Sequence, residues 1–196
     1  MKRFAIILAF AAAFLGAPVA QAVPVHFSAV LDGPSEFPPN ASPGIGFADV
    51  YFDIAAHTMR VTASFSGLLD ITAAAHIHCC TAVPGTGLAA PATTTPTLVG
   101  FPAGVTSDVY DDILDMTLAS SFRAGFITAN GGTPASAEAA LFAGMLAEKA
   151  YFNIHTNVFP GGEIRGFLQL VPEPGSLALL GLGLAGLGFS RRKRTS

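Results

Sequence analysis

The chain has 196 residues, of which 51% are hydrophobic and 12% charged, and its formal net charge at pH 7 is −3. This length suits one domain with a proper hydrophobic core. The low and slightly negative charge excludes the basic surface of a nucleic-acid-binding protein, so we expect no nucleic-acid partner.

The N-terminus has the organisation of a secretory signal peptide. Two cationic residues precede an apolar stretch over residues 4–15, and Ala20-Gln21-Ala22 supplies a signal-peptidase pattern. We therefore assign residues 1–22 to a signal peptide and expect the exported domain to cover residues 23–170.

Apolar and polar residues alternate in several segments of this domain, which is the pattern of half-buried β-strands. The short segment Ala55-Ala56-His57 predicts a hairpin between the second and third of these segments. The side chains predicted to point inward are Val25, Phe27, Ala29 and Leu31; Ala48, Val50, Phe52 and Ile54; Met59, Val61, Ala63 and Phe65; and Leu114, Met116 and Leu118.

One helix is predicted, with Thr133 as N-cap, Pro134 at its first position and an alanine-rich run to about Ala147. A second hairpin is predicted from residues 151–155 and 163–170, around the turn Pro160-Gly161-Gly162. Short strands, frequent turns and a single helix predict an all-β fold, an antiparallel Greek-key β-sandwich or barrel.

Three histidines are the candidate chemical residues. His76 and His78 are two residues apart on a predicted strand, so their side chains share a face, and alternation in the final hairpin places His155 on the side away from the core. A His-x-His pair with a distant third histidine is a usual set of transition-metal ligands, and an exported protein would meet copper or zinc.

The alternative is a polar network without a metal. Asn153, Glu163 and Arg165 are predicted on the same side as the histidines, with Asn153 near Arg165 and His155 near Glu163. Because no fourth ligand is evident, we prefer the network and keep the metal site at His76, His78 and His155 as the alternative. His26 and His57 are expected to be exposed.

The only two cysteines, Cys79 and Cys80, are adjacent in the chain. Export favours a disulfide, although bridging neighbouring residues requires a strained ring. A disulfide between these two residues, an intermolecular bridge and metal-bound thiols all remain open.

The sequence resembles the CHRD domain, a module first named from chordin, over roughly residues 25–170. The resemblance implies a β-rich extracellular module that accompanies binding functions. Many members have glycines where this chain has Cys79 and Cys80. The matching motifs are Phe27-Ser28-Ala29-Val30-Leu31-Asp32-Gly33, Ala75-His76-Ile77-His78, Tyr151-Phe152-Asn153-Ile154-His155-Thr156 and Pro160-Gly161-Gly162-Glu163-Ile164-Arg165-Gly166.

A weaker likeness is to Cu/Zn superoxide dismutase, a Greek-key β-sandwich with a His-x-His strand and an arginine near its C-terminus. By that likeness the three histidines would be metal ligands and Arg165 would guide an anion. The chain lacks the dense His and Asp cluster of a zinc half-site, and a shared fold does not carry activity across.

The C-terminal segment, residues 171–196, has the organisation of a sorting signal. Pro172-Glu173-Pro174 is followed by about 13 apolar residues, which we expect to form a hydrophobic helix, and then by the basic cluster Arg191-Arg192-Lys193-Arg194. This arrangement resembles the PEP-CTERM signal. The resemblance implies processing by the membrane protease exosortase in a Gram-negative bacterium, with transient anchoring in the inner membrane.

The sequence therefore predicts an exported cell-surface or matrix protein. We expect a non-enzymatic binding or structural module whose partner is an extracellular protein or polysaccharide. The alternative is a copper- or zinc-dependent redox protein that uses the three histidines.

Overall fold

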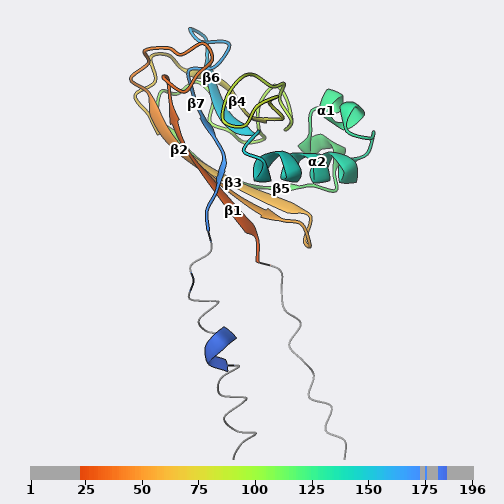
Figure 1. Ribbon diagram of the computed structural model, residues 1–196. Coiled ribbons are helices and arrows are strands. Elements are labelled where there is room, and N and C mark those ends of the chain that lie inside the picture. Colours follow the sequence, from red (N-terminus) through yellow and green to blue (C-terminus); the bar gives the residue numbers. More distant parts are fainter. Residues whose placement is uncertain (1–22, 173–174, 176–180, 185–196) are drawn as a thin grey trace, which may run out of the picture.

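The computed structural model describes residues 23–172, 175 and 181–184 (Figure 1). The predicted signal peptide, Glu173-Pro174 of the sorting motif and most of the predicted C-terminal helix lie outside the described residues. None of the helices in the described part has the length and hydrophobicity of a membrane span. The strands are β1 (Val25–Asp32), β2 (Ile45–Asp53), β3 (Thr58–Ser66), β4 (Thr72–His78), β5 (Asp108–Asp115), β6 (Tyr151–Thr156), β7 (Ile164–Phe167) and β8 (Gln169–Leu170).

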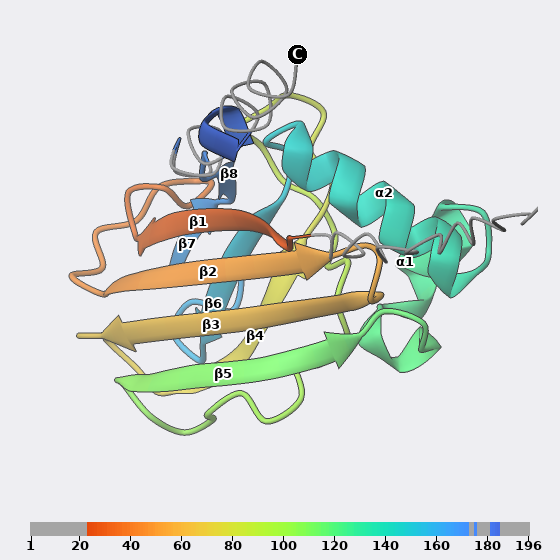
Figure 2. The same cartoon turned by 90° about the horizontal axis from the view of Figure 1, so that it is seen from below.

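All eight strands belong to one antiparallel sheet in the order β4-β6-β7-β1-β2-β3-β5, and β8 pairs with β1 beside β7. The sheet curls on itself, so that β4, β6 and β7 lie behind β1, β2 and β3 (Figure 2). The predicted antiparallel all-β fold is confirmed, in the form of a curled half-barrel whose two walls enclose the core.

The inward residues of β1, β2 and β3 are those that alternation predicts. Phe27, Val50 and Val61 are fully buried, and the β2–β3 hairpin pairs Val50 with Val61. Two predictions at strand ends are wrong, because the chain turns there. Ile54 lies in the hairpin turn, where the Asp53 carboxylate accepts hydrogen bonds from the amides of Ala55 and Ala56. Leu118 precedes the 3-10 turn Ala119–Ser121, and both Ile54 and Leu118 are exposed.

Helix α2 (Pro134–Leu146) confirms the predicted helix. The hydroxyl of Thr133 accepts from the Ser136 amide, and the Ser136 hydroxyl accepts from the Thr133 amide, which completes a capping box. Leu141 and Met145 are fully buried against the core. A second short helix, α1 (Ala124–Ala129), was not predicted, and it lies beside α2 (Figure 1).

Both ends of the domain leave from the same pole. The amide of Val171 donates to the His26 carbonyl at the start of β1, whereas Asp32 at the other end of β1 pairs with Arg165. The loops that follow β1 and β6 lie at the opposite pole (Figure 1). The chain therefore enters and leaves the domain at the pole opposite to these loops, and β6, which carries His155, ends at the loop pole (Figure 1).

Candidate metal centre

The three histidines come together on the outer face of the β4–β6 pair. In this pair His76 lies opposite Asn153, and Ala74 lies opposite His155. Because residues two apart on a strand share a face, His155 projects on the same side as His76 and His78. As alternation predicts, the three histidines lie on the side of the sheet away from the core.

The three rings surround a common point. Their centroids are 5.5 Å apart for His76 and His78, 5.1 Å for His76 and His155, and 5.7 Å for His78 and His155. One nitrogen of each ring lies within 4.8 Å of one nitrogen of each of the others. His76 Nδ1 lies 3.3 Å from His155 Nε2.

The second nitrogen of each ring is fixed by a backbone carbonyl from a loop. His76 Nε2 contacts the Pro96 carbonyl, His78 Nδ1 lies 2.9 Å from the Ala89 carbonyl, and His155 Nδ1 lies 3.0 Å from the Pro160 carbonyl. Two loops, residues 79–97 and 157–163, thus hold the rings. They also bury His76 and His78, which alternation alone would leave on an open face.

Burial makes the protonated form of these rings unfavourable. It lowers the pKa of His78 to about 3 and that of His155 to about 4, and it lowers the pKa of His76 as well. The neighbouring imidazoles depress the values for His78 and His155 further. All three rings are consequently neutral at pH 7.

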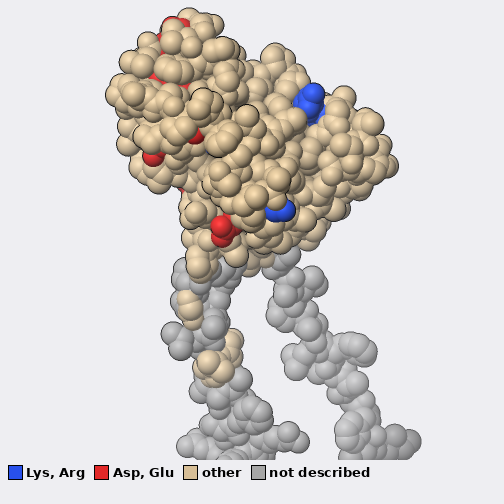
Figure 3. All heavy atoms as spheres, turned by 45° about the horizontal axis from the view of Figure 1, so that its top comes forward, with Lys and Arg blue, Asp and Glu red and all other residues tan. Residues whose placement is uncertain are grey.

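The cluster is accessible from one side. A hollow of about 340 Å³ reaches His76 and His155 and is otherwise lined by small or uncharged residues. Figure 3, which brings the pole opposite the chain ends forward, shows few and scattered charged side chains on that face. The lining residues besides the two histidines are Ala73, Ala74, Thr156, Asn157 and Pro160.

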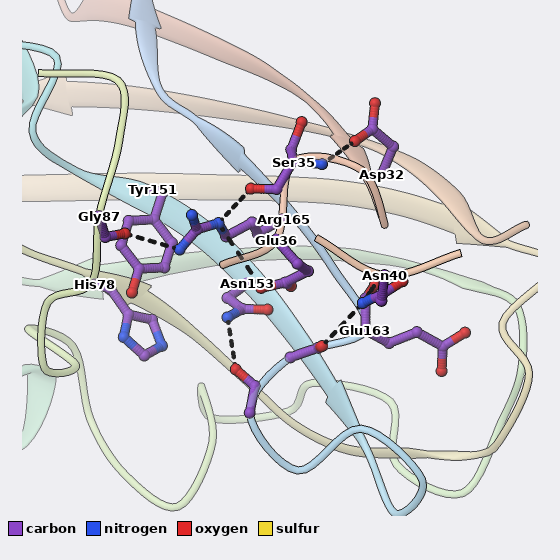
Figure 4. Close-up of polar contacts among 12 residues, drawn as sticks. Asp32, Ser35, Glu36, Asn40, His78, Gly87, Tyr151, Asn153, Glu163 and Arg165 are labelled. Carbon is purple, nitrogen blue, oxygen red and sulfur yellow. Dashed lines mark hydrogen bonds and ion pairs between the residues drawn. The ribbon is translucent and has the colours of Figure 1, made fainter. Parts of the chain in front are cut away.

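A buried arginine organises the neighbouring β6–β7 pair. Arg165, 2% exposed, lies opposite Asn153 in the sheet, and its guanidinium lies 4.6 Å from the centre of the Tyr151 ring. It donates to the Ser35 carbonyl at 2.6 Å and to the Gly87 carbonyl at 3.0 Å (Figure 4). Arg165 therefore ties two distant loops to the sheet.

This arginine has a buried acidic neighbour. Glu36 Oε2 lies 3.7 Å from Arg165 Nε, while Glu36 Oε1 and Asn153 Oδ1 are buried without a hydrogen-bond partner among the described residues. Burial raises the pKa of Glu36 to about 7, although the charge of Arg165 opposes that rise. Both unpartnered oxygens border the same small space, because each lies within 2.5 Å of the point that a Cβ on Gly162 would occupy.

Tyr151 connects the arginine to the histidines. Its ring stacks on His78 with centroids 4.8 Å apart and planes 10° apart, and Arg165 lies against the same ring. Neither Tyr151 nor Glu36 was predicted as a site residue, although Tyr151 belongs to one of the matching CHRD motifs. Glu36 is 129 positions from Arg165 in the chain, so no periodicity joins them, and its place in the loop after β1 is the only signal available.

Glu163 does not join this network. Its carboxylate accepts from the Ser42 hydroxyl at 2.6 Å, from the Leu69 amide at 2.6 Å and from the Thr156 hydroxyl at 2.7 Å. Figure 4 shows the side chain of Glu163 pointing away from Arg165. The structure thus brings Asn153 and Arg165 together and places the carboxylate of Glu163 in a separate loop-fixing site.

The two cysteines are bonded to each other. Cys79 follows His78 on the chain, but it is buried among the core residues, and both sulfurs lie against Gly144 of α2. The sulfurs are therefore on the other side of the strand from the imidazoles. Among the described residues, the candidate ligand cluster contains the three histidines and no sulfur.

Comparison with known families agrees with this architecture. The CHRD domain matches residues 27–168, and the PEP-CTERM protein-sorting motif matches residues 170–193. No curated protein and no solved structure matches the chain. The CHRD match spans nearly all of the sheet and its loops, and the sorting motif begins where β8 ends. The chain therefore belongs to the CHRD-domain family, and it carries a PEP-CTERM sorting signal that implies exosortase processing and export to the cell surface.

Proposed function

We propose that this protein is exported across the inner membrane of a Gram-negative bacterium, processed there by exosortase, and displayed at the cell surface or in the matrix as a non-enzymatic binding module. The observation that carries the proposal is the order of the two family matches, with the sorting motif following the domain at residue 170. Because β1 begins at Val25 and β8 ends at Leu170, removal of residues 1–22 and of the tail leaves all eight strands in place.

The sorting part of the proposal is tested by deleting residues 172–196. The truncated protein should be exported but lost from the cell surface, and a strain without exosortase should accumulate the full-length tail form in its membranes. The readouts are fractionation and the intact mass of the protein. Unchanged location and mass in both strains would refute processing through the tail.

The outer face of β1, β2, β3 and β5 supports a binding role. A row with three apolar residues crosses these strands, with Val30 beside Phe47, Phe47 beside Ser64 and Ser64 beside Val109. Phe47 is 52% exposed although it lies in the middle of the sheet. The next row is polar and consists of Ser28, Asp49, Thr62 and Asp111.

Two shallow hollows, of about 430 and 380 Å³, lie along these rows and share Phe47 and Asp49. A row across four strands spans roughly 14 Å, which suits a chain rather than a single small molecule. An aromatic ring beside hydroxyls and carboxylates can pack against the C–H face of a sugar while it hydrogen-bonds the sugar hydroxyls. The partner that we propose is therefore an extended polysaccharide, rather than a protein.

The test uses the polysaccharide that the host itself secretes, in affinity gel electrophoresis with the exported protein. We expect that polysaccharide in the gel slows the wild type and that Phe47→Ala abolishes the effect. Ile113→Ala is the matched control, because Ile113 is an exposed apolar residue of the same face that lines neither hollow. Equal retardation of the wild type and Phe47→Ala, or none in the wild type, would refute glycan binding on this face.

A further inference from the structure

The three carbonyl contacts determine where the protons of the histidine rings lie. A carbonyl oxygen can only accept a hydrogen bond, so the ring nitrogen that faces it must carry the hydrogen. These nitrogens are His76 Nε2, His78 Nδ1 and His155 Nδ1. In a neutral imidazole the other nitrogen then has no hydrogen and presents a lone pair.

The three remaining nitrogens are His76 Nδ1, His78 Nε2 and His155 Nε2. The first and last of them are 3.3 Å apart, and one nitrogen of His78 lies within 4.8 Å of one nitrogen of each of the other two rings. His78 Nε2 is buried and has no hydrogen-bond partner among the described residues. Lone pairs that face one another at this distance repel unless a proton or another cation lies between them.

A single proton can bridge only two of these nitrogens, so it would leave the lone pair of the third ring without a partner. A metal ion satisfies all three lone pairs at once. Metal-bound histidines commonly donate their second N–H to a backbone carbonyl, which fixes the tautomer and the ring orientation. All three rings here have that contact.

We propose that His76 Nδ1, His78 Nε2 and His155 Nε2 bind one copper or zinc ion. Nitrogens bound to zinc at 2.0–2.1 Å in a tetrahedral site lie about 3.4 Å apart. The His76–His155 pair already has that spacing, and one nitrogen of His78 lies within 4.8 Å of one nitrogen of each of these two rings.

The hollow at His76 and His155 gives the ion an open coordination position. Three neutral imidazoles leave the charge of the ion uncompensated, so water, hydroxide or a small anion suits that position. Such a site binds copper more tightly than zinc, following the general order of affinities for nitrogen ligands. Copper occupancy is what the redox interpretation of the three histidines requires, because zinc has no redox chemistry.

The test is metal stoichiometry of the full chain, exported, purified in detergent and stripped with a chelator. The protein is loaded separately with Zn²⁺ and with copper, freed of excess metal by gel filtration and analysed by mass spectrometry. We expect about one equivalent in the wild type. His78→Gln and His155→Gln should lose it, whereas the matched controls His26→Gln and His57→Gln should keep it, because His26 and His57 pair instead with Asp49 and Glu138.

His155 is only half-buried, so His155→Gln is the variant that disturbs the fold least, and its circular dichroism melt provides the check on folding. X-ray absorption of the metal-loaded wild type, which needs no variant, should show three imidazole nitrogens around the ion. Less than about 0.1 equivalent in the folded wild type, or undiminished binding by folded His155→Gln, overturns the proposal. The glycan assay with Phe47→Ala is unaffected by that outcome, because Phe47 lies on β2 and the histidines on β4 and β6.

Discussion

Replacement of Glu36 by glutamine should make the protein more stable at alkaline pH than the wild type. Burial raises the pKa of the folded carboxyl to about 7 from an ordinary value of 4.5. Glutamine keeps the shape of the side chain and removes its titration. The difference in unfolding free energy between the two proteins therefore depends on pH.

Below pH 4.5 the Glu36 carboxyl is protonated in both the folded and the unfolded chain, so its contribution is fully present. Between pH 4.5 and 7 the unfolded chain releases the proton while the folded protein holds it, and stability is lost. Above pH 7 the loss is complete. A difference of about 2.5 pKa units corresponds to about 3 kcal/mol of unfolding free energy.

The assay is urea unfolding of the wild type and Glu36→Gln at pH 4, 6 and 8. The difference in unfolding free energy between the two proteins should change by about 3 kcal/mol across this range, in favour of the variant at pH 8. All other titrating groups are shared and cancel in the difference. Parallel pH profiles for the two proteins would refute a buried, neutral Glu36.

Three more outcomes follow from the same region. Arg165→Met should cost about 3–5 kcal/mol of unfolding free energy in thermal or urea melts, and less at pH 6, where Glu36 is mostly neutral, than at pH 8. An equal cost at both pH values would contradict the pairing. Gly166→Ala should separate β7 from β1, because a Cβ there would collide with the Val30 carbonyl; amide exchange should accelerate at this strand pair and stay slow in the β2–β3 hairpin. In ¹⁵N NMR of the metal-free protein, His78 should carry its hydrogen on Nδ1, the less common tautomer; a hydrogen on Nε2 would remove a ligand from the proposed site.

The sequence predicted the strands and the helix because local rules dominate there. Alternation places Phe27, Val50 and Val61 inward, and the Thr133 cap with Pro134 starts α2 where it was expected. The errors at Ile54 and Leu118 arise where a strand ends and alternation no longer determines the direction of a side chain. Periodicity cannot show which residue of a segment is the last one that pairs with the neighbouring strand.

The histidine face was predicted, but its surroundings were not. Alternation places His76, His78 and His155 together because neighbouring residues of β4 and β6 are in register. It says nothing of the loops that bring the carbonyls of Ala89, Pro96 and Pro160 against the rings. Those contacts join residues between 5 and 20 positions apart through irregular backbone, which has no period in the sequence.

Glu36 and Glu163 show the same limit for the carboxylates. Glu163 was expected beside the histidines, whereas its carboxylate lies with Ser42, Leu69 and Thr156, and Glu36 is the acidic group beside Arg165. Both placements depend on the path of residues 33–44, a loop that crosses from β1 to β2. A loop of this length can satisfy its buried polar atoms in many ways, so composition alone does not choose among them.

The most direct test of the convergent histidine nitrogens is anomalous X-ray diffraction from crystals grown with zinc or copper. A single strong anomalous peak should lie between His76 Nδ1, His78 Nε2 and His155 Nε2, at about 2.0–2.1 Å from each. A metal-soaked crystal without density among these three rings, or with its ion bound instead at the His26–Asp49 or His57–Glu138 pair, would contradict the account.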